Sequence, residues 1–119
     1  MSPSPPRDRR IEKIMQVLER YPAKDVRELG RLVNLSTSRL QHLFKAQTGS
    51  RVNDYLVECR LQAAARLLKS TELRIKEVTW RTGYRHSSSF DRAFKKRFAV
   101  GPAEYRKAQQ LLLKNSSSG

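Results

Sequence analysis

Apolar residues recur along most of the chain at spacings of three and four, the period of an α-helix with one buried face. A first apolar stripe runs from Ile11 to Leu18 and ends before Pro22. Asp25, followed three residues later by Glu28, has the spacing of a capping box at the start of a second helix. Strand-like alternation never persists for more than a few residues. The pattern therefore predicts an all-helical domain.

Five further helices are indicated by the same periodicity and by residues that start or stop helices. They are expected at residues 36–49, 52–69, 75–82 and 86–98, and from Pro102 onward. Ser36 is the expected N-cap of the first of them, and Gly49 and Gly83 mark two of the ends. The helix at 52–69 is long enough to link two halves of the chain.

The chain repeats itself at about half its length, which is the feature that says most about its organisation. Four positions between Val26 and Leu35 match similar residues 49 positions later. Four more between Leu40 and Tyr55 match residues 50 positions later. One extra residue near Arg85 explains the change of offset. We infer two copies of one helical unit.

Each copy has the three features of a helix-turn-helix. These are a small residue where the second helix packs closely on the first, a turn residue that tolerates positive φ, and an apolar residue directly after it. In order they are Gly30, Asn34 and Leu35 in the first copy and Thr79, Gly83 and Tyr84 in the second. Two generic helical hairpins would not be expected to repeat all three features in register.

The charge of the chain narrows the choice of partner. Among 119 residues, 25 are Lys or Arg and 11 are Asp or Glu, which gives a formal net charge of +14. Such a positive field favours a polyanion, and nucleic acid is the first candidate. A membrane surface is the alternative polyanion, but the apolar residues form compact-core stripes rather than one long amphipathic face.

The residue types needed for catalysis or metal binding are sparse. Cys59 is the single cysteine, and the two histidines, His42 and His86, lie far apart in the sequence. The glutamates are scattered and no glycine-rich phosphate loop is present. We therefore expect no enzyme activity, no cofactor and no metal. No apolar run reaches membrane-spanning length and no signal peptide is visible, so the cytoplasm, in association with the nucleoid, is the expected location.

The segment IKEVTWRTGYRHSSSFDRAFKKRFAVGPAEYR, residues 75–106, closely resembles the second-unit signature of the AraC/XylS transcription regulators. The resemblance implies a seven-helix, homeodomain-like domain in which a long helix joins two helix-turn-helix units. It also implies a role in transcription control, RNA polymerase as a partner, and an effector-binding domain N-terminal to the module. Arg74, Thr79 and residues 85–87 depart from the residues most common in the family, which bears on base preference rather than fold.

The expected organisation along the chain has five segments. Pro- and Ser-rich residues 1–9 are interpreted as a linker or disordered start, and residues 115–119 as a disordered tail or a cloning remnant. Between them lie the first helix-turn-helix unit at 10–50, the linking helix at 51–70 and the second unit at 71–114.

The second helix of each unit is the candidate DNA reader, because an α-helix fits the major groove, where each base pair presents a distinct pattern of donors and acceptors. The expected base-reading residues are Ser38, Gln41 and His42 in the first reader and Ser87, Ser88, Asp91 and Arg92 in the second. The expected contacts to the DNA backbone are Thr37, Arg39, Lys45, Arg51, Lys95 and Lys96.

Chemistry assigns roles to some of these side chains. Gln41 can pair with adenine through two hydrogen bonds, and Arg92 can pair with guanine in the same way. His42 is suited to a guanine or to a phosphate. Asp91 could accept a hydrogen bond from cytosine or pair with neighbouring cations, and the sequence leaves both roles open. The serines of the second reader are short, so we expect specificity to be weighted toward the first.

The length of the linking helix predicts the size of the DNA site. Residues 52–69 at 1.5 Å per residue span roughly 27 Å, against roughly 34 Å between successive major-groove faces of straight DNA. Tilted readers or a bent duplex would therefore place both units in adjacent major grooves.

A low-specificity architectural DNA-binding protein is the alternative function. A fragment of a DNA-repair methyltransferase is a third, but it needs a reactive cysteine that Cys59 does not provide.

Overall fold

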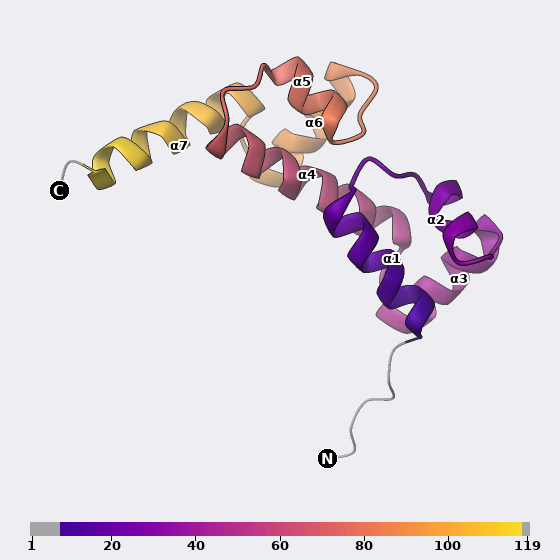
Figure 1. The fold of residues 1–119 in the computed structure, drawn as a ribbon. Helices are drawn as coiled ribbons and strands as arrows, with labels where there is room; N and C mark the ends of the chain where they lie inside the picture. Colours follow the sequence, from indigo (N-terminus) through magenta and orange to yellow (C-terminus); the bar gives the residue numbers. More distant parts are fainter. Residues whose placement is uncertain (1–7, 118–119) are drawn as a thin grey trace, which may run out of the picture. The chain divides into compact units, whose positions relative to one another are not determined.

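The computed structural model describes residues 8–117, which form seven α-helices and no strand (Figure 1). The helices are α1 (Arg9–Arg20), α2 (Val26–Leu32), α3 (Thr37–Thr48), α4 (Val52–Ser70), α5 (Ile75–Arg81), α6 (Ser87–Phe98) and α7 (Pro102–Ser117). The prediction of an all-helical, seven-helix fold is confirmed.

Two compact units divide the chain, with the boundary between Cys59 and Arg60, inside α4. Unit 1 contains α1, α2, α3 and the first part of α4, and unit 2 contains the rest of α4 with α5, α6 and α7. The sequence placed the linking helix in a segment of its own. In the structure its first part, with Leu56, belongs to the core of unit 1, and its second part, with Leu61, belongs to the core of unit 2.

The core of unit 1 collects one apolar face from each of its helices. Its buried members are Ile11, Ile14, Leu18, Leu29, Leu40, Phe44, Val52 and Leu56. Helix α1 begins at Arg9, inside the expected linker, because the Asp8 carboxylate accepts a hydrogen bond from the Arg10 backbone N–H at 2.9 Å and caps the helix. Residues 1–7 of that expected linker lie outside the described residues.

The core of unit 2 combines aliphatic side chains with a cluster of aromatic rings. Its buried members are Leu61, Ala64, Ala65, Leu68, Val78, Phe90 and Phe94. The ring centroid of Tyr105 lies 5.3 Å from that of Phe94 and 5.4 Å from that of Phe98. These contacts fasten α6 to α7.

Helix α7 is fastened along its first part. Tyr105 packs into the core of unit 2, and the Arg106 guanidinium donates a hydrogen bond from Nε to the Leu68 carbonyl at 3.1 Å. Further along, residues 111–113 are exposed, although an apolar run of this kind would be expected to pack. The helix continues to Ser117, past the expected start of the tail at residue 115, because the backbone hydrogen bonds of a helix need no tertiary partner.

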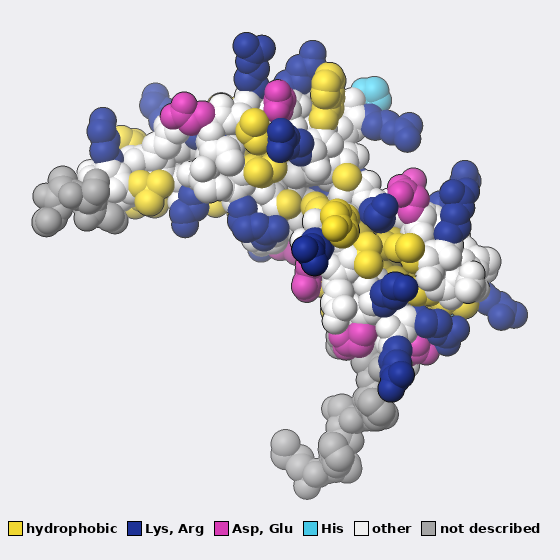
Figure 2. All heavy atoms as spheres, viewed as in Figure 1, with side chains coloured by type: hydrophobic (Ala, Val, Ile, Leu, Met, Phe, Trp, Pro, Cys, Tyr) yellow, Lys and Arg dark blue, Asp and Glu magenta, His cyan; other side chains and the backbone are white. Residues whose placement is uncertain are grey.

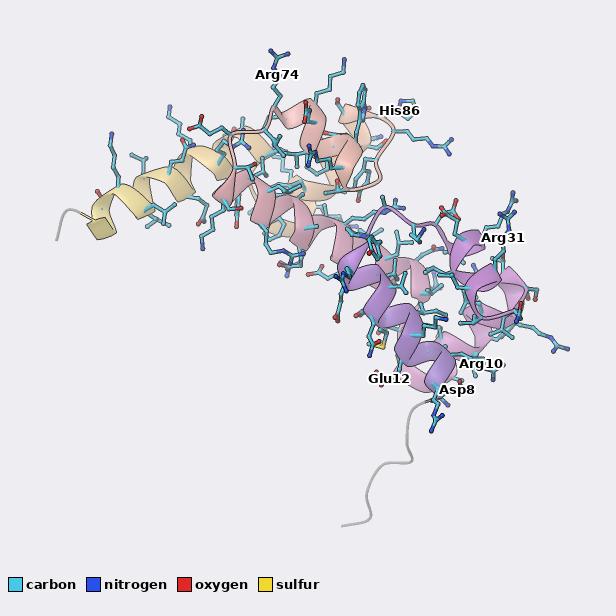
Figure 3. All side chains as sticks on the ribbon, viewed as in Figure 1. Asp8, Arg10, Glu12, Arg31, Arg74 and His86 are labelled. Atoms are coloured by element: carbon cyan, nitrogen blue, oxygen red, sulfur yellow. The ribbon has the colours of Figure 1, made fainter. Side chains whose placement is uncertain are left out.

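The helix N-termini differ between the two units in how they are capped. Asp25 forms a complete capping box with Glu28 at the start of α2, and the Ser36 side chain accepts a hydrogen bond from the Arg39 N–H at the start of α3. The equivalent residues of unit 2, Arg74 and His86, make no side-chain cap. Arg74 points away from its helix in Figure 3. Unit 2 therefore lacks two stabilising interactions that unit 1 has.

Replacing Arg74 with serine should stabilise unit 2. A serine N-cap accepts a hydrogen bond from the backbone of the first turn and contributes about 1 kcal/mol. We expect Arg74→Ser to raise the free energy of unfolding by about this amount, measured by urea denaturation. The matched control, Ser36→Ala, should lower it by about the same amount. An unchanged or reduced stability of Arg74→Ser would contradict the conclusion that α5 lacks a stabilising N-cap.

Helices α3 and α6 end with the same backbone geometry, α3 at a glycine and α6 at an alanine. Gly49 after α3 has φ of 80° and Ala99 after α6 has φ of 70°. In both cases the residue's N–H donates to the carbonyl four residues earlier, Lys45 or Lys95, at 2.8 Å. A left-handed backbone costs an L-residue roughly 1–2 kcal/mol, and glycine avoids this cost. At this helix end, unit 2 therefore carries a strain that unit 1 does not.

We expect Ala99→Gly to stabilise the protein by about 0.5–1 kcal/mol, because relief of the left-handed strain exceeds the extra entropy that glycine loses on folding. The reciprocal change, Gly49→Ala, should destabilise it by about 1 kcal/mol. No atom lies within 4 Å of a Cβ at Gly49, so this cost is conformational and not steric. Denaturation midpoints measure both changes. If Gly49→Ala left the stability unchanged, the conclusion that alanine is strained at these helix ends would be wrong.

Candidate nucleic-acid interface

The turn between α2 and α3 is set by one close approach of two backbone segments. The Leu35 N–H donates to the Gly30 carbonyl at 2.9 Å, and Asn34 between them has φ of 56°. A Cβ added at Gly30 would lie 2.6 Å from the Leu35 carbonyl oxygen, closer than real Cβ contacts. The predicted roles of Gly30 and Asn34 are confirmed, and the turn carries the geometry of a helix-turn-helix.

The turn between α5 and α6 repeats this arrangement 49 residues later. The Tyr84 N–H donates to the Thr79 carbonyl at 3.1 Å, and Gly83 has φ of 98°. Thr79 is fully buried, and its hydroxyl donates to the Ile75 carbonyl at 2.9 Å. Four residues separate α2 from α3 and five separate α5 from α6, so the extra residue lies in this turn, as the repeat predicted.

Helix α3 buries one face and exposes the opposite one. Leu40 and Phe44 are buried in the core of unit 1. The expected contacts on this helix, Thr37, Ser38, Arg39, Gln41, His42 and Lys45, are all exposed. The structure therefore leaves them accessible to a ligand along the outer side of the helix.

Helix α6 has the same division of faces in unit 2. Phe90 and Phe94 are buried, and the expected contacts Ser87, Ser88, Asp91, Arg92, Lys95 and Lys96 are all exposed. Lys95 and Lys96 stand in the last turn, where cations are favoured by the helix dipole. Arg92 stands 50 residues after His42, at the equivalent place on its helix.

Four of the residues predicted for unit 1 come together at one hollow. A cleft of about 350 Å³ is lined by Gln41, His42 and Lys45 of α3, and by Arg51, Val52 and Asn53 where α4 begins. We call it the first cleft. Asn53 was not among the predicted residues, because only the folded chain brings the start of α4 against α3.

Unit 2 has a cleft of the same volume, about 350 Å³, and five of its seven lining residues stand 50 positions after residues that line the first cleft. We call it the second cleft, and it is lined by Ile75, Asp91, Lys95, Gly101, Pro102, Ala103 and Glu104. The signal that relates the two clefts was in the sequence, since the 50-residue offset extends to Tyr55 and Tyr105. The sequence carried no signal that these positions line a hollow.

The surface around the readers is rich in cations. Lys and Arg side chains project from both units in Figure 2, with fewer carboxylates among them. Arg31 on α2 projects outward in Figure 3. Trp80 takes the equivalent place on α5, where it is 59% exposed and the Lys76 ammonium lies 5.2 Å from its ring centroid. An exposed polar and cationic face on each unit is suited to a polyanion.

Residues 8–117 contain no group of three or more His, Cys, Asp or Glu side chains that could hold a metal ion. Cys59 is partly buried against the core of unit 1, as a small hydrophobic residue would be. No helix among the described residues is long and apolar enough to cross a membrane.

A family model described as a helix-turn-helix domain, of the AraC type, matches residues 29–108 and so covers parts of both units. The chain belongs to the AraC/XylS family. The resemblance seen in residues 75–106 is thereby confirmed.

Curated members of the AraC/XylS family match across most of the chain. The arabinose operon regulatory protein of Escherichia coli K12 is 33% identical over 105 residues, covering 86% of this chain and 36% of that protein. The HTH-type transcriptional regulator MtrA of Neisseria gonorrhoeae is 30% identical over 102 residues, covering 84% of this chain and 34% of that protein. The chain thus spans about a third of the length of these relatives.

Solved structures give the same AraC-type fold. The C-terminal domain of AraT, a response regulator from Geobacillus stearothermophilus, superposes with a TM-score of 0.77 at 28% identity, covering 87% of this chain and 88% of that one. The DNA-binding domain of AdpA, a global transcriptional factor solved in complex with a target DNA, gives a TM-score of 0.75 at 26% identity, covering 85% of this chain and 93% of that one.

Proposed function

We propose that this chain binds specific sequences of double-stranded DNA and serves as the DNA-binding module of a transcription regulator. The observation that carries the proposal is the pair of helix-turn-helix turns, each of which leaves the polar outer face of a reader helix exposed. The net charge of +14 adds the attraction for DNA phosphates that non-specific affinity requires. The AraC/XylS membership and the DNA complex of AdpA support the same function.

Helices α3 and α6 are the recognition helices in this proposal. Gln41 is suited to adenine and Arg92 to guanine, each through two hydrogen bonds in the major groove. His42 and the serines at positions 38, 87 and 88 complete the reading faces, and Asp91 either accepts from cytosine or orients Arg92. Specificity is weighted toward α3, whose polar side chains are longer than the serines of α6.

Contacts to the DNA backbone fix the register of these reading faces. Arg39, Lys45, Arg51, Lys95 and Lys96 supply charge, and Thr37 supplies a hydroxyl. The uncapped first turn of α6 supports this role, because its backbone N–H groups have no side-chain acceptor at the N-cap and can donate to a phosphate.

The wider setting of the module is also a proposal. We propose that RNA polymerase is a partner of the regulator and that an effector-binding domain precedes this module in it. The site of action is the nucleoid in the cytoplasm. The curated relatives, about two and a half times as long as this chain, support the presence of further domains.

The length of the protected DNA tests the two-reader arrangement. Helix α4 has 19 residues, about 28 Å at 1.5 Å per residue, which suits two readers in adjacent major grooves. Selection from a random DNA pool followed by footprinting should give an asymmetric site of about two helical turns. A footprint confined to one turn would rule out simultaneous reading by both units. Loss of all preference against competitor DNA at physiological salt would favour the architectural alternative.

Two substitutions separate base reading from backbone contact. Arg92→Ala should cost about 1–3 kcal/mol on the selected site and relax the preference at one base pair. Lys45→Ala should weaken binding to all sequences alike and flatten the salt dependence. Binding isotherms on the selected site and on single-base variants check both. The division of roles is wrong if the two variants lose affinity in the same way across those sequences.

A further inference from the structure

The repeat places two hollows of equal volume at equivalent positions, and they differ in charge. Lys45 in the first cleft corresponds to Lys95 in the second, and Gln41 corresponds to Asp91. Arg51 of the first cleft corresponds to Gly101 of the second. The first cleft is thus lined by two cations and no carboxylate, and the second by one lysine and two carboxylates, Asp91 and Glu104.

The cations of the first cleft are available to a ligand. Among residues 8–117, neither Lys45 nor Arg51 forms an ion pair, and both side chains are exposed. Asn53 is also exposed and adds an amide that can donate a hydrogen bond to an anionic oxygen. The nearest acid in sequence, Asp54, is not part of the lining, whereas its equivalent, Glu104, lines the second cleft.

We propose that the first cleft binds one phosphate of the DNA backbone, held by Arg51 and Lys45 and hydrogen-bonded by the side-chain amide of Asn53. This rests on the proposed function, since it assumes that α3 lies against DNA. Arg51 supplies the planar fork that matches two phosphate oxygens, and Lys45 supplies a compact charge. Asn53 is thereby assigned as a DNA-contacting residue.

The second cleft does not bind phosphate in this way. Asp91 and Glu104 oppose an anion through like charge, and Gly101 and Ala103 offer no donor side chain where Arg51 and Asn53 stand in unit 1. The two units therefore contact the DNA backbone differently, although both have the same helix-turn-helix fold.

The position of the first cleft links it to base reading. Gln41 and His42 line the same hollow as Arg51 and Asn53. A phosphate fixed there sets the depth at which α3 enters the groove, and so it sets the distance from these two side chains to the base edges. Loss of the phosphate contact should weaken binding to all sequences and leave the order of base preference unchanged.

The test compares the full chain with the double variant Arg51→Ala/Asn53→Ala on the DNA site obtained by selection. Affinity should fall roughly ten- to hundredfold, as expected for losing hydrogen bonds to a charged group. The slope of log affinity against log salt should become shallower by about 0.9. Arg20→Ala is the control: it removes an exposed cation on the last turn of α1, and affinity should change by less than about threefold. Thermal unfolding should be unchanged in both, since all three side chains are exposed.

A scan with neutral methylphosphonate linkages locates the contact on the DNA. Wild-type protein should lose affinity when one particular phosphate is neutralised, and the double variant should be insensitive at that phosphate alone. The proposal is overturned if the double variant binds as tightly as wild type or keeps the wild-type methylphosphonate profile. Failure to select any preferred DNA sequence would instead overturn the proposed function, so the two failures are distinguishable.

Discussion

The helix-turn-helix of unit 1 depends on the hydrogen bond from the Leu35 N–H to the Gly30 carbonyl. This bond fixes the crossing of α2 and α3, and the crossing leaves the outer face of α3 free for DNA while Leu40 and Phe44 fill the core. Glycine fits because a Cβ at Gly30 would lie 2.6 Å from the Leu35 carbonyl oxygen. Unit 2 forms the same bond with Thr79 in place of glycine. The backbone bond is therefore the shared constraint, and glycine is one way to accommodate it.

Features with a local cause could be predicted from the sequence. The period of apolar residues, the capping box at Asp25 and the single extra residue near Arg85 each lie within a few positions of what they determine, and each is present in the structure. The left-handed conformation of Ala99 could not be predicted, because positive φ is common for glycine but rare for alanine. The first cleft could not be predicted, since α3 and the start of α4 meet only after folding.

The two units reach stability by different routes. Unit 2 has no side-chain N-cap on α5 or α6, and α6 ends on Ala99 where α3 ends on a glycine. Each of these three differences lowers the stability of unit 2 by about 1 kcal/mol. Among the described residues, unit 2 has five aromatic ring contacts and unit 1 has one. Each contact contributes about 0.5–1.5 kcal/mol beyond its buried area, so the aromatic core is large enough to offset the missing caps.

The difference in N-capping between α3 and α6 also affects how each unit could contact DNA. An N-cap side chain uses the backbone N–H groups that a phosphate would otherwise accept from, so the cap at Ser36 and the open start of α6 favour different phosphate contacts. In the proposed function, Arg51 and Lys45 of unit 1 contact a phosphate in the cleft that Gln41 and His42 also line, so these cations lie beside the proposed base-reading side chains. We therefore expect base pairs read by α3 to contribute more discrimination than those read by α6. In the proposed function the two units therefore contribute unequally to one asymmetric DNA site.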